Sequence, residues 1–112
     1  MDIDREVLKG YIDTILLSLL HKEPLYGYEL VKRSRENSDG TFEIKEATLY
    51  LALKRTEKNG YTESYWDNSE SGGGRRKYYK LTDEGRSRLQ SKKSEWEYLK
   101  CTMDKFLGGV DL

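Results

Sequence analysis

The chain has 112 residues, one proline and one cysteine, and its 20 basic and 20 acidic side chains cancel. This length predicts one small soluble domain, whose core is marginal alone and therefore favours oligomerisation. Cys101 cannot form an internal disulfide, no apolar run can cross a bilayer and the N-terminus lacks the order of a signal peptide, so we expect a cytoplasmic protein without membrane contacts.

The N-terminal segment has a strong helical periodicity. Apolar residues recur every four positions in two adjacent rows, and the face that they form is wider than a small surface helix needs. We expect one helix that begins at Asp4 as its N-cap and ends near His21, because Pro24 disfavours helical geometry at the residue before it. Gly10 inside this helix suggests close approach of another helix. The two rows are Val7, Tyr11, Ile15 and Leu19, and Leu8, Ile12, Leu16 and Leu20.

Two further helices are expected in the middle of the chain. The second helix extends from about Tyr26 to Asn37, and residues 37–40 are dense in turn formers. Residues 41–44 alternate polar with apolar side chains, like a very short strand. The third helix extends from about Lys45 to Asn59, and Gly60 is expected to cap its C-terminus.

The third helix has the composition of a DNA recognition helix. Leu49, Ala52 and Leu53 can face the core, so the other side chains lie largely on the remaining faces. Those faces bring hydroxyl, phenol, apolar and cationic groups together, and such groups can reach base edges in a major groove. They belong to Thr48, Tyr50, Leu51, Lys54 and Arg55.

A β-hairpin is expected after the third helix. Residues 61–66 have the alternation and the aromatic content of a strand, residues 67–74 are rich in turn formers, and residues 75–80 form the returning strand. We expect a flexible, basic tip. Gly72, Gly73 and Gly74 lack the spacing of a phosphate-cradling loop and fit the turn of a wing better.

Basic residues cluster in this part of a neutral chain. Residues 45–80 hold eight basic and five acidic side chains, a local net charge of +3. Arg75, Arg76 and Lys77 stand beside phenols and suit contact with DNA phosphates. The alternative is a strand edge that stays charged to prevent edge-to-edge pairing. The preceding helices favour DNA contact, because the whole order is typical of a winged helix-turn-helix, a mainly α fold with a small β-hairpin (α+β).

The C-terminal segment predicts a dimerisation helix that Thr82 caps. Two sets of residues recur every seven positions, like the seam of a coiled coil with one polar member, Lys92. A two-fold dimer would place two recognition helices about one DNA turn apart and would read an inverted repeat. We expect residues 1–81 to bind DNA and residues 82–112 to dimerise, with help from the N-terminal helix. The expected interface residues are Val7, Tyr11, Ile15, Leu89, Trp96, Leu99, Met103 and Phe106.

Short sequence blocks across nearly the whole chain resemble the PadR family of bacterial transcriptional regulators. They are Tyr26-Gly27-Tyr28-Glu29-Leu30, Ala47-Thr48-Leu49-Tyr50, Leu53-Lys54-Arg55, Glu57-Lys58-Asn59-Gly60, Gly74-Arg75-Arg76-Lys77-Tyr78-Tyr79 and Leu81-Thr82-x-x-Gly85.

The resemblance implies a dimeric winged helix-turn-helix repressor of the compact subfamily, which binds double-stranded operator DNA. Two residues depart from the family pattern. Leu51 replaces a usual proline and can alter contacts at the DNA face, and Thr56 replaces a usual leucine and weakens core packing. The expected DNA-binding residues are Tyr26, Lys45, Thr48, Tyr50, Leu51, Lys54, Arg55, Arg75, Arg76, Lys77 and Tyr79.

Trp96 lies in the middle of the expected seam. By periodicity alone it is a core anchor. The resemblance implies a second role, because multidrug-sensing members of the PadR family use a tryptophan at this place, with its symmetry mate, to hold flat aromatic compounds. We therefore expect Trp96 to bind a small aromatic effector.

The sequence does not favour an enzyme. His21 is the only histidine, so the chain cannot build a histidine-based catalytic triad or a multi-histidine metal site, and Cys101 is more consistent with an incidental thiol than with a nucleophile. We expect no catalytic residue, metal or cofactor. A winged helix that binds only protein, without sequence-specific DNA binding, remains the alternative function.

Overall fold

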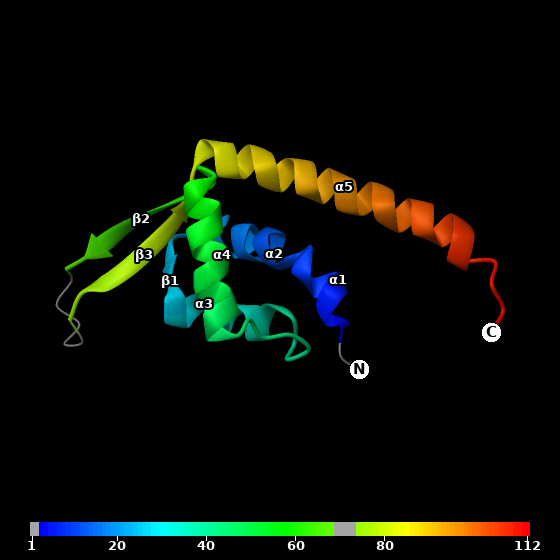
Figure 1. Cartoon of the computed structure of the whole chain (residues 1–112), viewed down its shortest axis with the longest axis horizontal. Helices are drawn as coiled ribbons and strands as arrows, with labels where there is room; N and C mark the ends of the chain where they lie inside the picture. Colours follow the sequence, from blue (N-terminus) through cyan, green and yellow to red (C-terminus); the bar gives the residue numbers. More distant parts are fainter. Residues whose placement is uncertain (1–2, 69–73) are drawn as a thin grey trace.

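The computed structural model describes residues 3–68 and 74–112, which form a mainly helical protein with one small antiparallel sheet (Figure 1). This confirms the predicted α+β winged-helix fold. The prediction of a wing turn at Gly72 and Gly73, with a flexible tip, lies outside the described residues. In chain order the elements are α1 (Arg5–Lys9), α2 (Ile12–Leu20), β1 (Leu25–Tyr26), α3 (Gly27–Asn37), α4 (Glu46–Lys58), β2 (Thr62–Asp67), β3 (Arg76–Leu81) and α5 (Asp83–Leu107).

The core lies where α2, α3 and α4 meet the inner face of the sheet. The apolar positions that periodicity assigned to the core of α4 are buried, as predicted. Thr56 is also fully buried, and its hydroxyl shares a 3.0 Å hydrogen bond with the hydroxyl of Thr62, so the departure from leucine adds a paired polar group to the core. The buried apolar residues are Ile12, Leu16, Leu17, Leu19, Leu20, Leu25, Leu30, Ile44, Leu49, Ala52, Leu53, Tyr79 and Leu81.

The N-terminal helix is interrupted, so the prediction of one continuous helix was wrong. Asp4 caps α1 as expected, because its carboxylate accepts a 2.7 Å hydrogen bond from the Glu6 backbone N–H. The chain then turns at Gly10 and Tyr11 before α2 begins. A side chain at Gly10 would meet only the Val7 carbonyl oxygen, at 3.7 Å, so this glycine marks the break and not a close helix contact.

The third strand of the sheet was not predicted. Residues 41–44 form no strand, whereas β1 pairs with β3 through Leu25 opposite Tyr79 and Tyr26 opposite Tyr78. The strand order is therefore β1-β3-β2. The turn formers before residue 41 act as expected, because Asp39 and Gly40 have positive φ angles of 53° and 81°. The sheet is thus tied to the N-terminal half of the domain.

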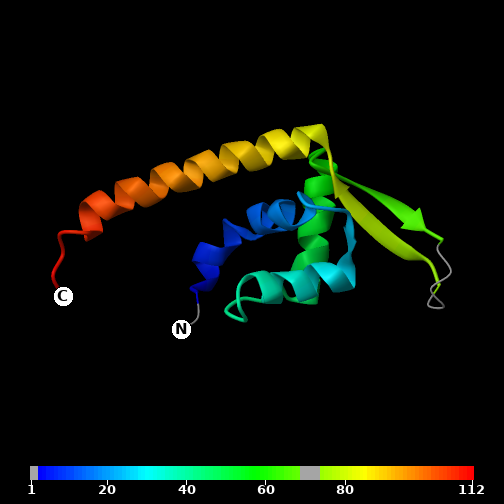
Figure 2. The same ribbon diagram turned by 180° about the vertical axis from the view of Figure 1, so that it is seen from behind.

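The molecule is elongated. Its principal extents are 58 × 30 × 21 Å, and its radius of gyration of 16.2 Å exceeds the value of about 13 Å for a compact chain of roughly this length. Figure 2 shows the reason: α5 extends past α2 and α1, away from the hairpin of β2 and β3. No helix within residues 3–68 and 74–112 combines the length and the apolar character that a membrane span requires.

Candidate nucleic-acid interface

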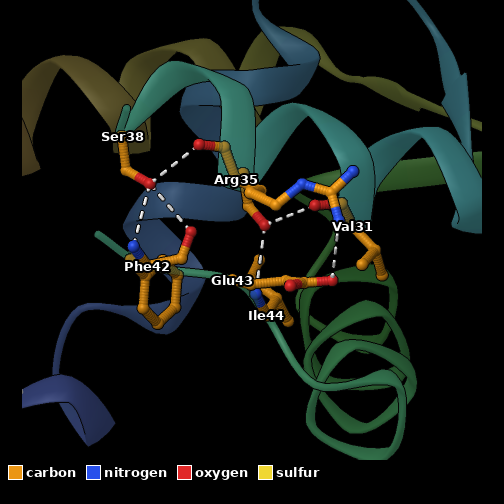
Figure 3. Close-up of polar contacts among 7 residues, drawn as sticks. Val31, Arg35, Ser38, Phe42, Glu43 and Ile44 are labelled. Carbon is orange, nitrogen blue, oxygen red and sulfur yellow. Dashed lines mark hydrogen bonds and ion pairs between the residues drawn. The ribbon is translucent and has the colours of Figure 1, made fainter. Parts of the chain in front are cut away.

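The loop between α3 and α4 is held by two serine side chains, which fix the start of α4 (Figure 3). The Ser34 hydroxyl donates to the Val31 carbonyl at 2.7 Å and accepts from the Ile44 backbone N–H at 3.0 Å. The Ser38 hydroxyl accepts from the Phe42 N–H at 2.9 Å. Because Ile44 is buried two residues before α4, the helix begins from an anchored position. The direction of α4 is therefore set by the fold.

One face of α4 is open to solvent. Ala47, Leu51, Lys54 and Lys58 follow one another at helical spacing and are all exposed, and Leu51 retains 65% of its surface. In the described part of the chain, neither lysine forms an ion pair. Lys58 was not among the predicted DNA-binding residues, although its spacing from Lys54 puts both on the same face. This face is apolar at one end and cationic at the other.

Other predicted contacts lie along the edges of that face. Thr48 is exposed on one edge and Tyr50 on the other, and Lys45 precedes the first turn as its N-cap. The Tyr50 hydroxyl packs on Gly27 at the start of α3, where an added Cβ would lie 2.7 Å from the phenol oxygen. Tyr50 also borders a groove of about 590 Å³ between α3 and the start of α4. Lys45 and Tyr50 border this groove, whereas Thr48 lies on the other edge of the open face.

Arg55 points to α2, unlike the other basic side chains of α4. Its Nε and Nη2 donate to the two carboxylate oxygens of Asp13 at 2.9 and 2.5 Å. The hydrogen bond to Asp13 raises the pKa of Arg55 above its usual value. Arg55 thus links α4 to α2 and is only partly available to another anion, and its action together with Lys54 at the DNA face stays a prediction.

This ion pair leads to a first prediction. Asp13→Asn removes the negative charge that competes for Arg55, so we expect tighter binding to DNA of any sequence and a steeper salt dependence, by up to about one unit of slope. Stability should change by less than about 1 kcal/mol, because both side chains of the pair are about half-exposed and screened by solvent. Fluorescence anisotropy at several salt concentrations measures the affinity for DNA and its salt dependence, for the unaltered chain and for the variant. An unchanged slope would mean that Arg55 does not contact phosphate even when it is free.

A row of tyrosines extends from the outer face of the sheet to the start of α3. Tyr65 stacks on Tyr78 with ring centroids 5.8 Å apart, Tyr78 meets the edge of Tyr26 at 5.4 Å, and Tyr26 stacks on Tyr28 at 6.3 Å. Three of these rings, those of Tyr28, Tyr65 and Tyr78, were not among the predicted site residues. Cross-strand pairing brings Tyr26, Tyr65 and Tyr78 together, and that register was not available from the sequence.

The cations of the hairpin lie over aromatic rings. The Arg76 guanidinium is 4.8 Å from the Tyr26 ring centroid, and that of Arg75 is 4.9 Å from the ring of Trp66. The Lys77 ammonium is 6.0 Å from the same indole. Such contacts attract a cation to the ring without neutralising it, so the charge stays available to a phosphate. Arg75 and Lys77 therefore share the ring of Trp66, whereas Arg76 lies over Tyr26 on the other face of β3. The role of all three in DNA contact stays a prediction.

Tyr79 is not a surface residue, and its assignment to the DNA-binding set was wrong. Only 7% of its surface is exposed, because its side chain is on the inner face of the sheet while that of Tyr78 is on the outer face. Burial raises the pKa of the Tyr79 phenol, and the negative charge of Glu57 contributes further. Tyr79 therefore belongs to the core.

The expected dimer residues divide into two groups. Ile15 and Leu89 are half-buried against the core of the same protomer, and Tyr11 meets Trp96 edge to face at a centroid distance of 5.7 Å. Trp96 nevertheless keeps 47% of its surface exposed and borders a cavity of about 300 Å³ between α2 and α5. The remaining residues are exposed: Val7, Leu99, Met103 and Phe106. In α5, Leu99, Met103 and Phe106 thus form one exposed apolar stripe, whereas the exposed Tyr98 lies on another side of the helix.

Comparisons with known proteins place this surface in context. A sequence profile described as "Transcriptional regulator PadR-like family" matches residues 16–91. A protein of Lysinibacillus sphaericus, called "Uncharacterized protein X", is 36% identical over 106 residues, which are 95% of this chain and 96% of that protein.

Solved structures of bacterial regulators are also similar. A transcriptional regulator from Clostridium thermocellum is 46% identical with a TM-score of 0.84, and the match covers 94% of this chain and 98% of that one. A PadR family transcription regulator from Clostridium difficile is 49% identical with a TM-score of 0.78, covering 88% and 99%. A PadR-like transcriptional regulator from Bacillus cereus is 32% identical with a TM-score of 0.80, covering 94% and 99%.

Proposed function

Because the chain belongs to the PadR-like family of transcriptional regulators, which bind DNA, we propose that it is a dimeric repressor of an inverted-repeat operator and that a small planar aromatic effector releases it. The observation that carries this proposal is the open face of α4 beside the cations of the hairpin. A helix enters a major groove, while the charged hairpin contacts the neighbouring backbone.

The proposed contacts divide between bases and phosphates. Thr48, Leu51 and Lys54 lie on or beside the open face of α4 and would meet base edges and thymine methyl groups. Tyr26 and Tyr50 would support them from the edges of the site. Phosphate contacts would come from Lys45, Arg75, Arg76 and Lys77.

The proposed dimer forms through residues 82–112, with the N-terminal helices beside them. Leu99, Met103 and Phe106 are exposed on one side of α5, and such a stripe loses unfavourable contact with water when it packs on a second copy. A dimer that pairs the two α5 helices would carry one winged domain, residues 1–81, at each end. Two α4 helices could then read two half-sites.

Selection from random duplex DNA tests the function. The proposal predicts enrichment of one inverted repeat, whereas a winged helix that binds only protein would enrich no sequence.

A second prediction separates the base contacts from the phosphate contacts. Arg76→Ala should weaken binding to every sequence and reduce the salt slope by about one unit per protomer, while Thr48→Ala should change the preferred bases and leave the slope unchanged. Anisotropy titrations at several salt concentrations measure both effects. Equal loss of slope in both variants would contradict this division.

The effector proposal rests on Trp96, which is half-exposed beside the cavity between α2 and α5. Two copies of its indole, one from each protomer, could hold a flat ring between them and gain apolar burial without a fixed hydrogen-bond pattern. The alternative is that Trp96 only anchors α5 on Tyr11, since the two rings are in contact.

Fluorescence separates the two roles of Trp96. In a Trp66→Phe background, planar aromatic dyes should quench the remaining tryptophan and release the selected DNA. Trp96→Ala removes the proposed stacking surface, so the dyes should no longer release the DNA, although the dimer and its DNA affinity are kept. A ligand acts only through its different affinity for the two states. If no dye in a broad panel quenches Trp96, the residue serves packing alone.

A further inference from the structure

Backbone hydrogen bonds cap the C-terminus of α4, next to the start of α5. Gly60 has a φ angle of +80°, and its N–H donates to the Glu57 carbonyl at 3.1 Å. The next N–H, that of Tyr61, donates to the Thr56 carbonyl at 2.9 Å. This is the pattern of a Schellman motif, in which a glycine past the helix end supplies the left-handed turn. The carbonyl groups of Gly60 and Tyr61 then point away from α4.

Thr82 donates a hydrogen bond to each of these carbonyl groups. Its hydroxyl donates to the Gly60 carbonyl at 2.6 Å and its backbone N–H donates to the Tyr61 carbonyl at 3.1 Å. The same hydroxyl accepts a 2.9 Å hydrogen bond from the Gly85 N–H and so caps α5. One side chain therefore joins the last turn of α4 to the first turn of α5.

Gly85 allows the two backbones to touch. It is buried, and a Cβ at this position would overlap the Tyr61 carbonyl oxygen and lie 2.8 Å from Cδ1 of Leu81. Arg88, one turn later, places its guanidinium 5.6 Å from the Tyr61 ring centroid. At Gly85 the contact with Tyr61 is thus made by backbone atoms, and the Thr82 hydroxyl adds a side-chain hydrogen bond to it. Farther along α5, the contacts with the winged domain are side-chain contacts, such as that of Tyr11 with Trp96.

We propose that Thr82 and Gly85 are positioning residues that fix the angle between α4 and α5 and thereby set the half-site spacing that the dimer recognises. This inference rests on the proposed function, because spacing has meaning only for a dimer on a repeated site. Thr48 lies twelve residues from Gly60, about 18 Å along the helix at 1.5 Å per residue. A change of about ten degrees at the joint would move Thr48 by about 3 Å, close to the rise of one base pair, about 3.4 Å.

Operators with altered spacing test the inference. The duplex selected with the unaltered protein serves as reference, and its half-sites are moved apart or together by one and two base pairs. The unaltered dimer should lose about tenfold in affinity or more for each changed spacing. Thr82→Val keeps the side-chain shape without the hydroxyl hydrogen bonds. The affinity of this variant should therefore fall less than about threefold when the half-site spacing is changed. Thr82→Ser, which restores the hydroxyl, should regain the discrimination.

The controls separate this inference from the proposed function. Ser87→Ala changes an exposed residue of the same helix and should leave the spacing preference unchanged. Gly85→Ala should relax or shift the preferred spacing because its Cβ would overlap the Tyr61 carbonyl oxygen. If Thr82→Val does not fold, Thr82→Ala takes its place, since it also lacks the hydroxyl. If folded, dimeric Thr82 and Gly85 variants discriminate as strongly as the unaltered protein, the inference is wrong and the proposed function stands. A protein that selects no repeat, or that sediments as a monomer, overturns both.

Discussion

A chain that carries Leu99→Lys and Met103→Lys will sediment as a folded monomer. Both side chains lie on the exposed stripe of α5, with 39% and 42% of their surface exposed, so charge is tolerated there in one protomer. Burying a Leu or Met side chain is worth about 1.5–3 kcal/mol, and two buried ammonium groups add a further cost. We expect dimerisation to weaken on the order of a thousandfold, with a matching loss of operator affinity.

The matched control places the same charges on the other side of α5. Ser94 and Cys101 lie on the side of the helix away from Leu99. The chain that carries Ser94→Lys and Cys101→Lys should therefore remain dimeric. Sedimentation velocity at several protein concentrations measures the association, and far-ultraviolet circular dichroism checks the fold. If the two double variants behave alike, α5 does not mediate the dimer through this stripe.

Lys54→Glu will abolish specific operator binding. Lys54 lies in the middle of the open face of α4 and forms no ion pair in the described part of the chain. A specific contact is worth about 1–3 kcal/mol, and the change occurs twice in a dimer, so we expect the affinity for the operator to fall roughly thirtyfold to twenty-thousandfold.

Lys105→Glu makes the same change in charge near the end of α5, far from α4 in Figure 1, and should retain most of the affinity. Anisotropy titration of both variants with the selected duplex gives the comparison. Equal losses in the two variants would mean that net charge, and not the surface of α4, determines binding.

Local patterns were sufficient to predict most elements of the fold. The core side of α4 follows from helical spacing, since Leu49, Ala52 and Leu53 recur on one face. The C-terminus of α4 follows from Gly60, which adopts a positive φ angle, and the N-terminus of α5 follows from Thr82, which caps it. Both strands of the hairpin were predicted within one residue of their observed limits. All of these signals act over a few neighbouring residues.

The errors come from contacts between distant parts of the chain. β1 has only two residues, and its pairing with Tyr78 and Tyr79 crosses half of the sequence. That register decides which of the two tyrosines is buried, because a shift of one residue exchanges the faces of a strand. The Asp13–Arg55 pair likewise joins residues 42 positions apart. Helical periodicity placed Arg55 at the edge of the DNA face but could not identify its partner.

The stoichiometry of the complex with DNA tests the central claim most directly. Sedimentation equilibrium or native mass spectrometry of the protein with the selected duplex determines how many protomers bind. A dimeric regulator of an inverted repeat should give two protomers on the intact site, with cooperative binding, and a much weaker complex when one half-site is scrambled. One protomer per duplex, or equal affinity for intact and scrambled sites, would contradict the claim.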